Sequence, residues 1–524
     1  MAQVRMQEDE KQREIAEEEE QSLHSSTIPH SSQLGLNLRP CSYALETNPS
    51  PLGLLSLPWE MVARIASHLS AQCILNVLPQ VCRALGQVGE DASAWQLRAH
   101  RLTGPRSSFP VCPRENFDWS TACLEMEQLI EWWVKEDEKA ETAHRVEQER
   151  EVQEEMEQDR ADRPNGEGAE VLVNGAAHED VEEMRLEEEA HERPGEGEEQ
   201  GNDVVLIREE GGENGAEEGG QDDSRTNSLE HITLSSGHIA DINAVLLVGG
   251  EGLVCVTGSR DRNVNLWDVR SGSNGVLLNT LKARGNFSTT HRGWVWCLAA
   301  SGNLLASGSF DSSVKLWDLQ AGGAERMVLK SRAAVLCLSC QQHMLFAGSH
   351  DQKVSIYDTR ATQPLVKSLR LHGDAVLSLA SDEQYILSGS KDNTVAVYDR
   401  RAGKVLTKVQ LQSYLLSMSY SGHEVWAGDN HGLLHTFSLS EGSLKPIAQF
   451  NVGHTSLVTG VHHSPGTLYT CSSDRTIKVH LPCAPPKTLC TLHYQAGLNG
   501  LSVEADVLAI ASGDIDVDVW RPKH

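Results

Sequence analysis

Thr257-Gly-Ser-Arg-Asp261, followed by Leu266-Trp267-Asp268, is the first copy of a motif that recurs along the C-terminal half of the chain. Three clear copies and a weaker one follow: Ser307-Gly-Ser-Phe-Asp311 to Trp317, Ala347-Gly-Ser-His-Asp351 to Tyr357, Ser388-Gly-Ser-Lys-Asp392 to Tyr398, and Thr470 through Asp474 to His480. Two degenerate copies end at Phe437, with His431 in place of the Asp, and at Trp520. The seven closing positions are 39 to 50 residues apart. Such spacing is typical of four-stranded propeller blades, which repeat every ~40–45 residues.

A histidine, usually beside a glycine, precedes several copies: Gly237-His238, His291, His372-Gly373 and Gly453-His454. With these histidines each copy resembles the WD repeat, and the resemblance covers residues 229–524. It implies a mainly β fold whose C-terminal part is a seven-bladed WD-repeat β-propeller.

The last repeat stops at Trp520 and has no outer strand of its own. A propeller protects its sheet edges by closing, so another segment must supply this strand. Leu229–Ser235 alternates apolar and polar residues, and we expect it to close the ring. The first interval is longer than the others, and the extra residues are expected in a surface loop around Gly272–Asn286.

Each blade is predicted to contain a buried relay of His, Ser or Thr, Asp and an aromatic residue. The three sets are His238, Thr257, Asp261 and Trp267; His291, Ser307, Asp311 and Trp317; and His372, Ser388, Asp392 and Tyr398. Because the same constellation recurs from blade to blade, we interpret it as structural, since a satisfied buried network fixes one geometry. We expect no catalytic residue, cofactor or metal site.

The formal net charge of −29 is unevenly distributed. Residues 131–230 contain 10 Lys+Arg against 35 Asp+Glu, whereas residues 231–524 contain 25 against 23. Too few apolar groups lie between Glu147 and Asp223 to offset the entropy of ordering, so a disordered acidic linker is expected at 147–228. We favour a solvated spacer over a segment that binds a basic partner.

No apolar run is long enough for a membrane span, and the charged N-terminus, part of an expected disordered segment 1–50, does not resemble a signal peptide. The twelve cysteines are scattered, and the pair Cys337 and Cys340 has no second pair nearby. Reduced thiols and a cytoplasmic or nuclear location are therefore expected. Neither nucleic acid nor a membrane is expected as a partner.

Residues 51–101 form a second informative segment. Leu57-Pro58 fits a helix start, Val62, Ile65 and Leu69 recur at helical spacing, and Val81-Cys82-Arg83 and Trp95 follow. Pro79 should bend or restart the helix that contains it. The combination resembles the F-box, with Leu85 where that family often has Trp.

A segment of about 45 residues is too small to bury a sufficient core alone, so its remaining apolar face needs a partner. The F-box resemblance implies that this partner is the Skp adaptor of an SCF-type (Skp, cullin, F-box) ubiquitin ligase, and through it the cullin scaffold and the RING subunit. The predicted adaptor contacts are Leu57, Pro58, Ile65, Leu69, Leu78 and Val81. The alternative is that these helices pack on the following segment and bind nothing.

A helical stalk is expected at 102–146. Asp118 is suited to cap its helix, and Trp119, Cys123, Met126, Ile130 and Trp133 form a stripe at helical spacing, more typical of packing than of a cofactor site. Either the acidic linker separates this stalk flexibly from the propeller, or the linker loops out while the stalk docks onto the propeller.

An F-box followed by a propeller predicts a substrate-recognition subunit that recruits and does not catalyse. The alternative is a WD-repeat scaffold with no link to degradation. In the WD-repeat family, substrates bind the face that carries the turn Asp residues, here called the top face. The corresponding residues are Arg260, Trp294, Trp296, Phe310, His350, Lys391 and Tyr414. Exposed aromatic residues favour an aromatic-anchored peptide over an obligatory phosphorylated one, which would need several converging arginines. One of the two tryptophans could instead fill the seam between blades.

Overall fold

The computed structural model describes residues 57–161 and 228–523, apart from residues 236, 251, 271 and 284–288. Residues from Pro58 onward form one compact unit, separate from residues 1–57. The expected N-terminal segment 1–50 and most of the expected linker, 147–228, lie outside the described residues. None of the helices in the described ranges is both long and apolar enough to cross a membrane.

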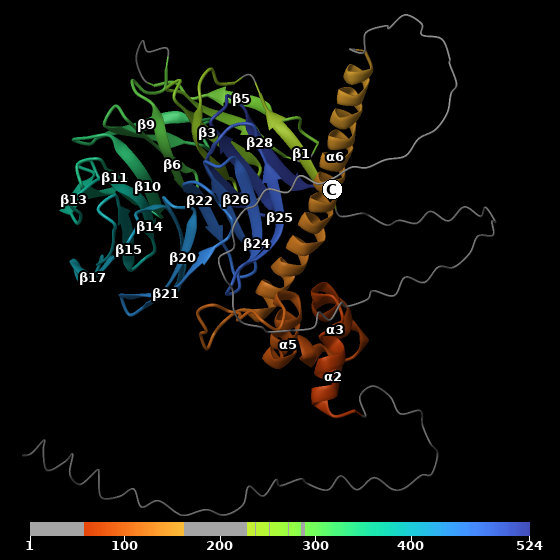
Figure 1. The fold of residues 1–524 in the computed structure, drawn as a ribbon. Coiled ribbons are helices and arrows are strands. Elements are labelled where there is room, and N and C mark those ends of the chain that lie inside the picture. Colours follow the sequence, from red (N-terminus) through yellow and green to blue (C-terminus); the bar gives the residue numbers. More distant parts are fainter. Residues whose placement is uncertain are drawn as a thin grey trace, which may run out of the picture. The chain divides into compact units, whose positions relative to one another are not determined.

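Seven four-stranded antiparallel sheets form the propeller (Figure 1), which confirms the predicted mainly β, seven-bladed fold. Blades 1 to 3 contain β2 (Ile242–Val248), β3 (Val254–Ser259), β4 (Val264–Asp268) and β5 (Val276–Thr280); β6 (Val295–Ser301), β7 (Leu304–Ser309), β8 (Ser313–Asp318) and β9 (Ala324–Lys330); and β10 (Val335–Gln341), β11 (Met344–Ser349), β12 (Lys353–Asp358) and β13 (Leu365–Arg370). Blades 4 and 5 contain β14 (Val376–Ser381), β15 (Tyr385–Ser390), β16 (Thr394–Asp399) and β17 (Lys404–Gln410); and β18 (Leu415–Ser421), β19 (Glu424–Asp429), β20 (Leu433–Ser440) and β21 (Ser443–Asn451). Blades 6 and 7 contain β22 (Val458–His463), β23 (Leu468–Ser472), β24 (Thr476–Leu481) and β25 (Lys487–His493); and β26 (Leu498–Glu504), β27 (Val507–Ser512), β28 (Val517–Pro522) and β1 (Leu229–Leu234).

The N-terminal strand β1 completes blade 7, as predicted from Leu229–Ser235. It pairs antiparallel with β28, with Ile232 opposite Val519. Arg521, only 3% exposed, pairs with Glu230 at 2.9 Å and donates to the carbonyls of Val269 and Ser273 at 2.9 and 2.7 Å. One buried guanidinium thus joins the closing strand to the strand-connecting loop of blade 1.

The extra residues of the first interval lie later than the sequence suggested. Strand β5 occupies the middle of the expected loop Gly272–Asn286, because blade 1 needs an outer strand like every other blade. Fourteen residues, 281–294, separate β5 from β6, whereas four separate β9 from β10. Thr290 Oγ1 donates to the Leu281 carbonyl at 2.5 Å and so holds the two ends of this connection together.

Between residues 57 and 161, the structure describes seven helical elements: α2 (Trp59–Ala66), a π-helical turn η2 (Cys73–Val77), α3 (Leu78–Val81), α4 (Arg83–Gly86), a 3-10 turn η3 (Gln87–Glu90), α5 (Ala92–Thr103) and α6 (Trp119–Ala161). Helix α3 begins beside Pro79, which lacks the amide that would donate to the Leu75 carbonyl. The chain does not leave the helical conformation at Pro79: the π-helical turn η2 passes directly into α3, and the helix ends at Cys82, which is extended. Helix α6 runs past residue 146, the expected end of the stalk, to Ala161.

Helix α6 docks on the outer strand of blade 6, β25, so the stalk contacts the propeller as in the second of the two arrangements, while the path of the linker lies outside the described residues. Asp118 Oδ1 caps the helix by accepting from the Thr121 amide at 3.1 Å. In the predicted stripe, Cys123, Met126 and Trp133 are buried, while Trp119 and Ile130 are half-buried. The core around them is continuous from the short helices into blades 6 and 7: it contains Val62, Ile74, Trp95, Tyr469, Ile477 and Leu508.

Polar contacts fix the position of α6 along the blade. Glu125 accepts from Ser464 Oγ at 2.6 Å and from the Gly466 amide at 2.7 Å. Trp133 Nε1 donates to the Tyr469 hydroxyl at 3.3 Å. Because these bonds join one helix face to one loop and one strand, the helix cannot slide without breaking them.

Gly466→Ala should loosen this dock. A Cβ at Gly466 would lie 2.4 Å from the Ala122 carbonyl oxygen and 2.6 Å from Glu125 Cβ, so α6 must move. We expect a loss of about 1–3 kcal/mol in the free energy of unfolding, and faster amide hydrogen exchange in residues 119–133. Gly500→Ala is the matched control, because the nearest atom to its Cβ is 4.0 Å away. Equal exchange in the two variants would contradict the dock.

Candidate functional site

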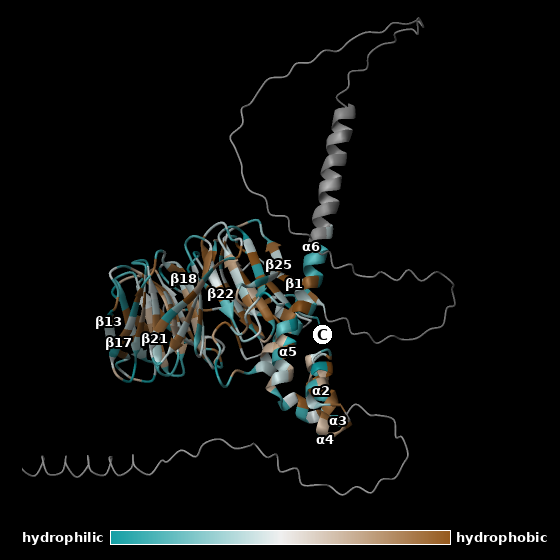
Figure 2. Cartoon of the chain, turned by 60° about the horizontal axis from the view of Figure 1, so that its bottom comes forward, coloured by the Kyte–Doolittle hydropathy of each residue, from teal (hydrophilic) through white to brown (hydrophobic). Residues whose placement is uncertain are grey.

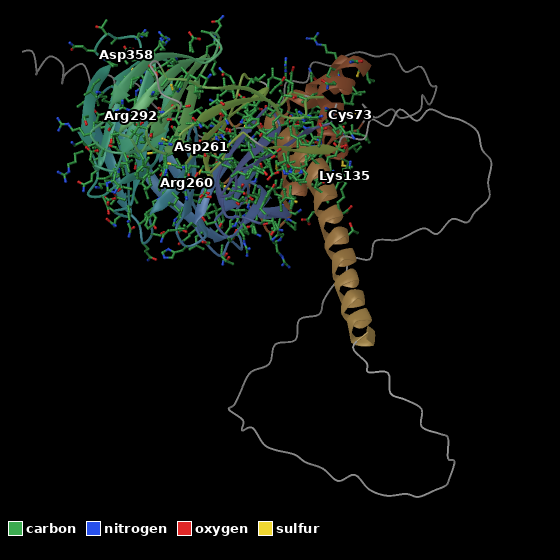
Figure 3. All side chains as sticks on the ribbon, turned by 90° about the horizontal axis from the view of Figure 1, so that it is seen from above. Cys73, Lys135, Arg260, Asp261, Arg292 and Asp358 are labelled. Atoms are coloured by element: carbon green, nitrogen blue, oxygen red, sulfur yellow. The ribbon has the colours of Figure 1, made fainter. Side chains whose placement is uncertain are left out.

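The short helices carry an apolar surface on the side away from the core. Four of the six predicted adaptor contacts are exposed: Leu57 (41%), Pro58, Ile65 (40%) and Val81 (64%). Figure 2 shows hydrophobic residues on α2 and α3, and Figure 3 labels Cys73 of this segment far from Arg260 on the propeller. The two candidate surfaces are thus separate.

Two predicted adaptor contacts face inward. Leu78 is buried and Leu69 is half-buried against the core. The expected single face of Val62, Ile65 and Leu69 is likewise divided, because Val62 is buried and Ile65 is exposed. Helix α2 has apolar residues both toward the core, such as Val62, and away from it, such as Ile65, so apolar spacing alone did not show which of them is buried.

Four exposed apolar residues were missed by the sequence reasoning: Trp59, Met61, Leu75 and Val77. Trp59 Nε1 donates to Asp91 Oδ2 at 2.7 Å, and Asp91 also caps α5 through the Ser93 amide at 2.8 Å. The position of this exposed ring is therefore fixed by the fold. Together with Ile65 and Val81, these residues are called the outer helical face.

On the top face, the residue before each turn Asp occupies an equivalent position in several blades. Its amide donates to the loop before the inner strand: Arg260 to Asp241, Phe310 to Trp294, His350 to Ala334 and Lys391 to Ala375, at 2.9 to 3.0 Å. The side chains of His350 and Lys391 are exposed, and that of Tyr414 is half-buried. The structure gives these three no contact with the aromatic residues of blade 2.

Blade 2 brings the predicted aromatic residues together with Arg260. The rings of Trp294 and Trp296 lie 5.6 and 5.3 Å from that of Phe310, centroid to centroid. The Arg260 guanidinium lies 5.5 Å above the Trp294 ring and pairs with Asp241 at 2.6 Å. Trp294 and Phe310 are 46% and 42% exposed, whereas Trp296 is half-buried. We call these four residues the blade 2 cluster.

The predicted relays are buried hydrogen-bond chains. In blade 1, His238 Nδ1 lies 2.8 Å from Asp261 Oδ2 and Nε2 lies 2.7 Å from Thr257 Oγ1, which accepts from Trp267 Nε1 at 2.9 Å.

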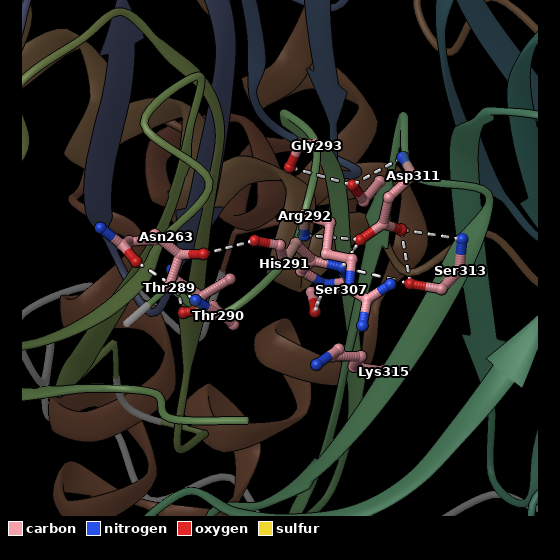
Figure 4. Close-up of polar contacts among 12 residues, drawn as sticks. Asn263, Thr289, Thr290, His291, Arg292, Gly293, Ser307, Asp311, Ser313 and Lys315 are labelled. Atoms are coloured by element: carbon pink, nitrogen blue, oxygen red, sulfur yellow. Dashed lines mark hydrogen bonds and ion pairs between the residues drawn. The ribbon is translucent and has the colours of Figure 1, made fainter. Parts of the chain in front are cut away.

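Blade 2 repeats this chain (Figure 4). His291 lies 3.1 Å from Asp311 and 2.8 Å from Ser307 Oγ, which accepts from Trp317 Nε1 at 2.9 Å. This connectivity matches an Asp-His-Ser triad, but Ser307 is 0% exposed, so no substrate can reach its hydroxyl.

Blade 4 departs from the prediction at its last member. His372 lies 2.7 Å from Ser388 Oγ and 3.4 Å from Asp392 Oδ1. The hydroxyl of Tyr398, however, accepts from Lys367 Nζ at 3.0 Å rather than joining Ser388, because a phenol reaches past the position of an indole N–H.

Blades 5 and 6 contain substitutes for motif residues, of which the sequence indicated His480 at the closing position of blade 6 but not Asp429 in blade 5. Asp429 takes the place of the missing turn Asp from two residues upstream, lying 2.6 Å from Ser413 Oγ and 2.9 Å from His435 Nε2. In blade 6, His480 replaces the closing Trp, with Nε2 3.0 Å from Thr470 Oγ1. Asp429 and His435 are both buried polar residues, but their burial becomes visible only in the structure.

In the blade 4 relay, the pKa values of the histidine and of the aspartate are both lowered. Burial lowers the pKa of His372. Burial acts to raise the pKa of Asp392, but hydrogen bonds from the Gly373 amide and the Thr394 hydroxyl hold that pKa at about 2. Burial likewise raises the pKa of the Cys112 thiol to about 11. Across residues 57–161 and 228–523, with their short gaps, no three His, Cys, Asp or Glu side chains are grouped to hold a metal ion.

His480→Trp should make the protein less sensitive to acid. Burial, with the nearby His454 and Lys478, lowers the pKa of His480 to about 3, against about 6.5 when unfolded. A lowered pKa means that the stability is complete above pH 6.5 and is lost as the pH falls toward 3, by about 1.4 kcal/mol per pH unit for one proton. The variant should lose this slope in a urea titration series, whereas the exposed His343→Gln control should keep it. If the variant kept the slope of the unaltered chain, His480 would take up its proton at the same pH in the folded and the unfolded protein.

Comparison with known proteins matches the chain to a repeat family, a solved propeller and two relatives. The profile described as WD domain, G-beta repeat matches residues 230–268, 282–318, 363–399 and 444–480. The solved structure of U3-55K aligns with 56% of this chain and 98% of its own, with a TM-score of 0.50 and 20% identity, which supports the propeller fold alone. F-box/WD repeat-containing protein 9 of Bos taurus and that of Homo sapiens are each 39% identical over 472 residues, 90% of this chain and 82% of theirs. By this identity and coverage, the chain belongs to the F-box/WD-repeat family.

Proposed function

We propose that the chain is the substrate-recognition subunit of an SCF-type ubiquitin ligase. The outer helical face binds the Skp adaptor, which links the chain to the cullin scaffold and the RING subunit. The top face of the propeller captures a substrate for ubiquitination. In this role the chain recruits and orients, and other subunits perform the chemistry.

The observation that carries the proposal is the outer helical face. Its residues, Trp59, Met61, Ile65, Leu75, Val77 and Val81, remain 37% to 64% exposed although the opposite side of the same helices is buried. A segment that already has a core does not need a second apolar surface for folding. Several exposed apolar side chains on neighbouring short helices favour a protein partner, and the family identifies the partner class.

The dock of α6 supports the proposal by linking the two surfaces rigidly. A receptor must hold its substrate at a set distance from the ubiquitin-carrying subunit, because proximity and orientation determine transfer. The core shared by the short helices, α6 and blades 6 and 7 contains buried Trp95, Met126 and Tyr469. Hinge motion between adaptor site and propeller would have to open this core.

The blade 2 cluster supports an unmodified peptide as substrate, anchored by a large apolar side chain. Trp294 and Phe310 present exposed ring surface, which is typical of binding hot spots. Arg260 is already paired with Asp241 at 2.6 Å and bonded to Asn243 at 3.3 Å, so it offers little to a phosphate. His350 and Lys391 precede the turn Asp of blades 3 and 4, and Tyr414 precedes the inner strand of blade 5. These three side chains would contact the peptide residues that flank the anchor.

Ile65→Asp combined with Val81→Asp should abolish adaptor binding. Each substitution would place an unpaired carboxylate in an apolar interface, at a cost of on the order of 2 kcal/mol or more, so affinity should fall about a thousandfold. Purified Skp adaptor with cullin, titrated against the full chain by calorimetry, is the measurement. Val276→Asp with Leu278→Asp is the matched control, because these residues are 59% and 52% exposed on β5. If the unaltered chain does not bind, the scaffold alternative is correct.

Trp294→Ala with Phe310→Ala should lengthen the half-lives of the same cellular proteins as Ile65→Asp with Val81→Asp, the variant that no longer binds the adaptor. The measurement is a comparison of protein half-lives in cells that express each variant. Arg260→Glu with Lys391→Glu is the companion variant, and we expect it to leave the half-lives near those of the unaltered chain. Stabilisation by the charge variant alone would instead favour a phosphorylated substrate.

A further inference from the structure

Three consecutive outer strands carry nearly all their charge as cations. Strands β9, β13 and β17, from blades 2, 3 and 4, together contain six Lys or Arg side chains: Arg326, Lys330, Lys367, Arg370, Lys404 and Lys408. All six are exposed. The only carboxylate on these strands, Glu325, is 9% exposed and pairs with Lys315 at 3.3 Å. We call the six cations the basic belt.

Few counter-charges within the propeller neutralise the belt. Lys367 Nζ donates to the uncharged Tyr398 hydroxyl at 3.0 Å, and Lys408 Nζ donates to the Leu371 carbonyl at 3.0 Å. The carboxylate nearest to a belt cation in the described part of the chain is Asp392, 3.6 Å from Lys408 and already bound to its relay. The like charges on the outer strands of these three neighbouring blades repel one another, so this surface favours an anionic partner.

Protection of sheet edges explains only part of the pattern. Lysines on outer strands discourage edge-to-edge pairing, and either sign of charge serves. In this propeller, however, β5 has no charged residue and exposes Val276, Leu277 and Leu278, while β21 has only Lys445. Cations are therefore concentrated on blades 2 to 4 rather than spread over every edge.

The complementary charge occurs in the same chain. Residues 162–227 contain 22 Asp or Glu against 5 Arg and no Lys, a net charge of −17. We propose that the basic belt binds this acidic segment. The inference does not depend on the proposed function, because it concerns neither the outer helical face nor the blade 2 cluster.

The tether makes this pairing favourable within one molecule. The segment leaves α6 at Ala161 and returns before β1 at Leu229. Sixty-six residues span up to about 220 Å, against a radius of gyration of about 19 Å for a domain of the propeller's size, so every blade can be reached. Linkage to the same unit raises the effective concentration to about millimolar. Each contact is weak and screened by salt, so the binding should be multivalent and salt-dependent.

Zero-length carbodiimide cross-linking of the full chain tests the proposal, because this reagent joins a carboxylate directly to a lysine amine in contact with it. Mass spectrometry should find Asp and Glu of residues 162–227 joined to Lys330, Lys367, Lys404 and Lys408 several-fold more often than to the exposed Lys282 and Lys445. The preference should disappear when salt is raised from about 0.05 M to about 0.5 M. Equal yields at all exposed lysines would overturn the proposal.

Arg326→Glu with Arg370→Glu removes belt charge but leaves all four belt amines available. Their cross-links should fall several-fold, whereas Arg262→Glu with Arg475→Glu, also exposed but outside the belt, should leave them unchanged. A loss in neither variant would overturn the proposal.

A fluorescent DNA duplex distinguishes the acidic segment from an external polyanion. A chain whose 22 acidic residues in 162–227 are changed to Asn and Gln should bind the duplex several-fold more tightly than the unaltered chain, because its belt is open. Equal binding by the two chains would mean that the segment does not cover the belt.

Discussion

The pairing of β1 with β28 is the constraint on which the rest of the structure depends, because it turns seven separate sheets into a closed ring. The buried Arg521 secures this junction. Neighbouring blades are also joined by side chains near the start of their inner strands. Asn243 donates to the Val295 carbonyl at 2.9 Å, and Asn499 donates to the Ile242 carbonyl at 2.7 Å, which spans the closing junction itself. These side-chain hydrogen bonds join blade 1 to blade 2 and blade 7 to blade 1, so the closing junction is held both by the β1–β28 ladder and by a bond between neighbouring blades.

A closed ring supplies a rigid wall for the helical part. The short helices could not bury their apolar side chains alone, and blade 6 completes their core through Tyr469 and its neighbours. The glycine at 466 lets the helix backbone approach within contact distance, and Glu125 then satisfies the amide that this approach buries. Packing and hydrogen bonding thus support each other at one loop. The short helices and the propeller are therefore held by a single core rather than by a tether.

Sequence patterns predicted what the repeat determines. The blades, the closing strand and the relays of blades 1 and 2 follow from residues that recur in the clear copies of the motif, such as His238 and Trp317. The predictions from sequence were wrong where either of two nearby residues could fill the same structural role. Asp429 replaces a turn Asp from two residues away, and Leu78 rather than Val77 enters the core after a π-helical turn that no periodicity announces. Both depend on tertiary contacts that become visible only when the chain is folded.

Two positions in the blades, the bulge of the inner strand and the residue before the turn Asp, can carry function in this repeat protein. Every blade has a bulge near the start of its inner strand, and every clear copy of the motif has a residue whose amide is held just before the turn Asp. The backbone at these points is fixed, but the side chains are not needed for folding. At the bulge, blade 1 has Asn243, which joins the next blade, whereas blade 2 has Trp296. At the position before the turn Asp, blade 1 has Arg260, whereas blade 2 has Phe310. An aromatic pair at two positions that the fold leaves free, in one blade only, is better explained by recognition than by stability, because the other blades fold without it.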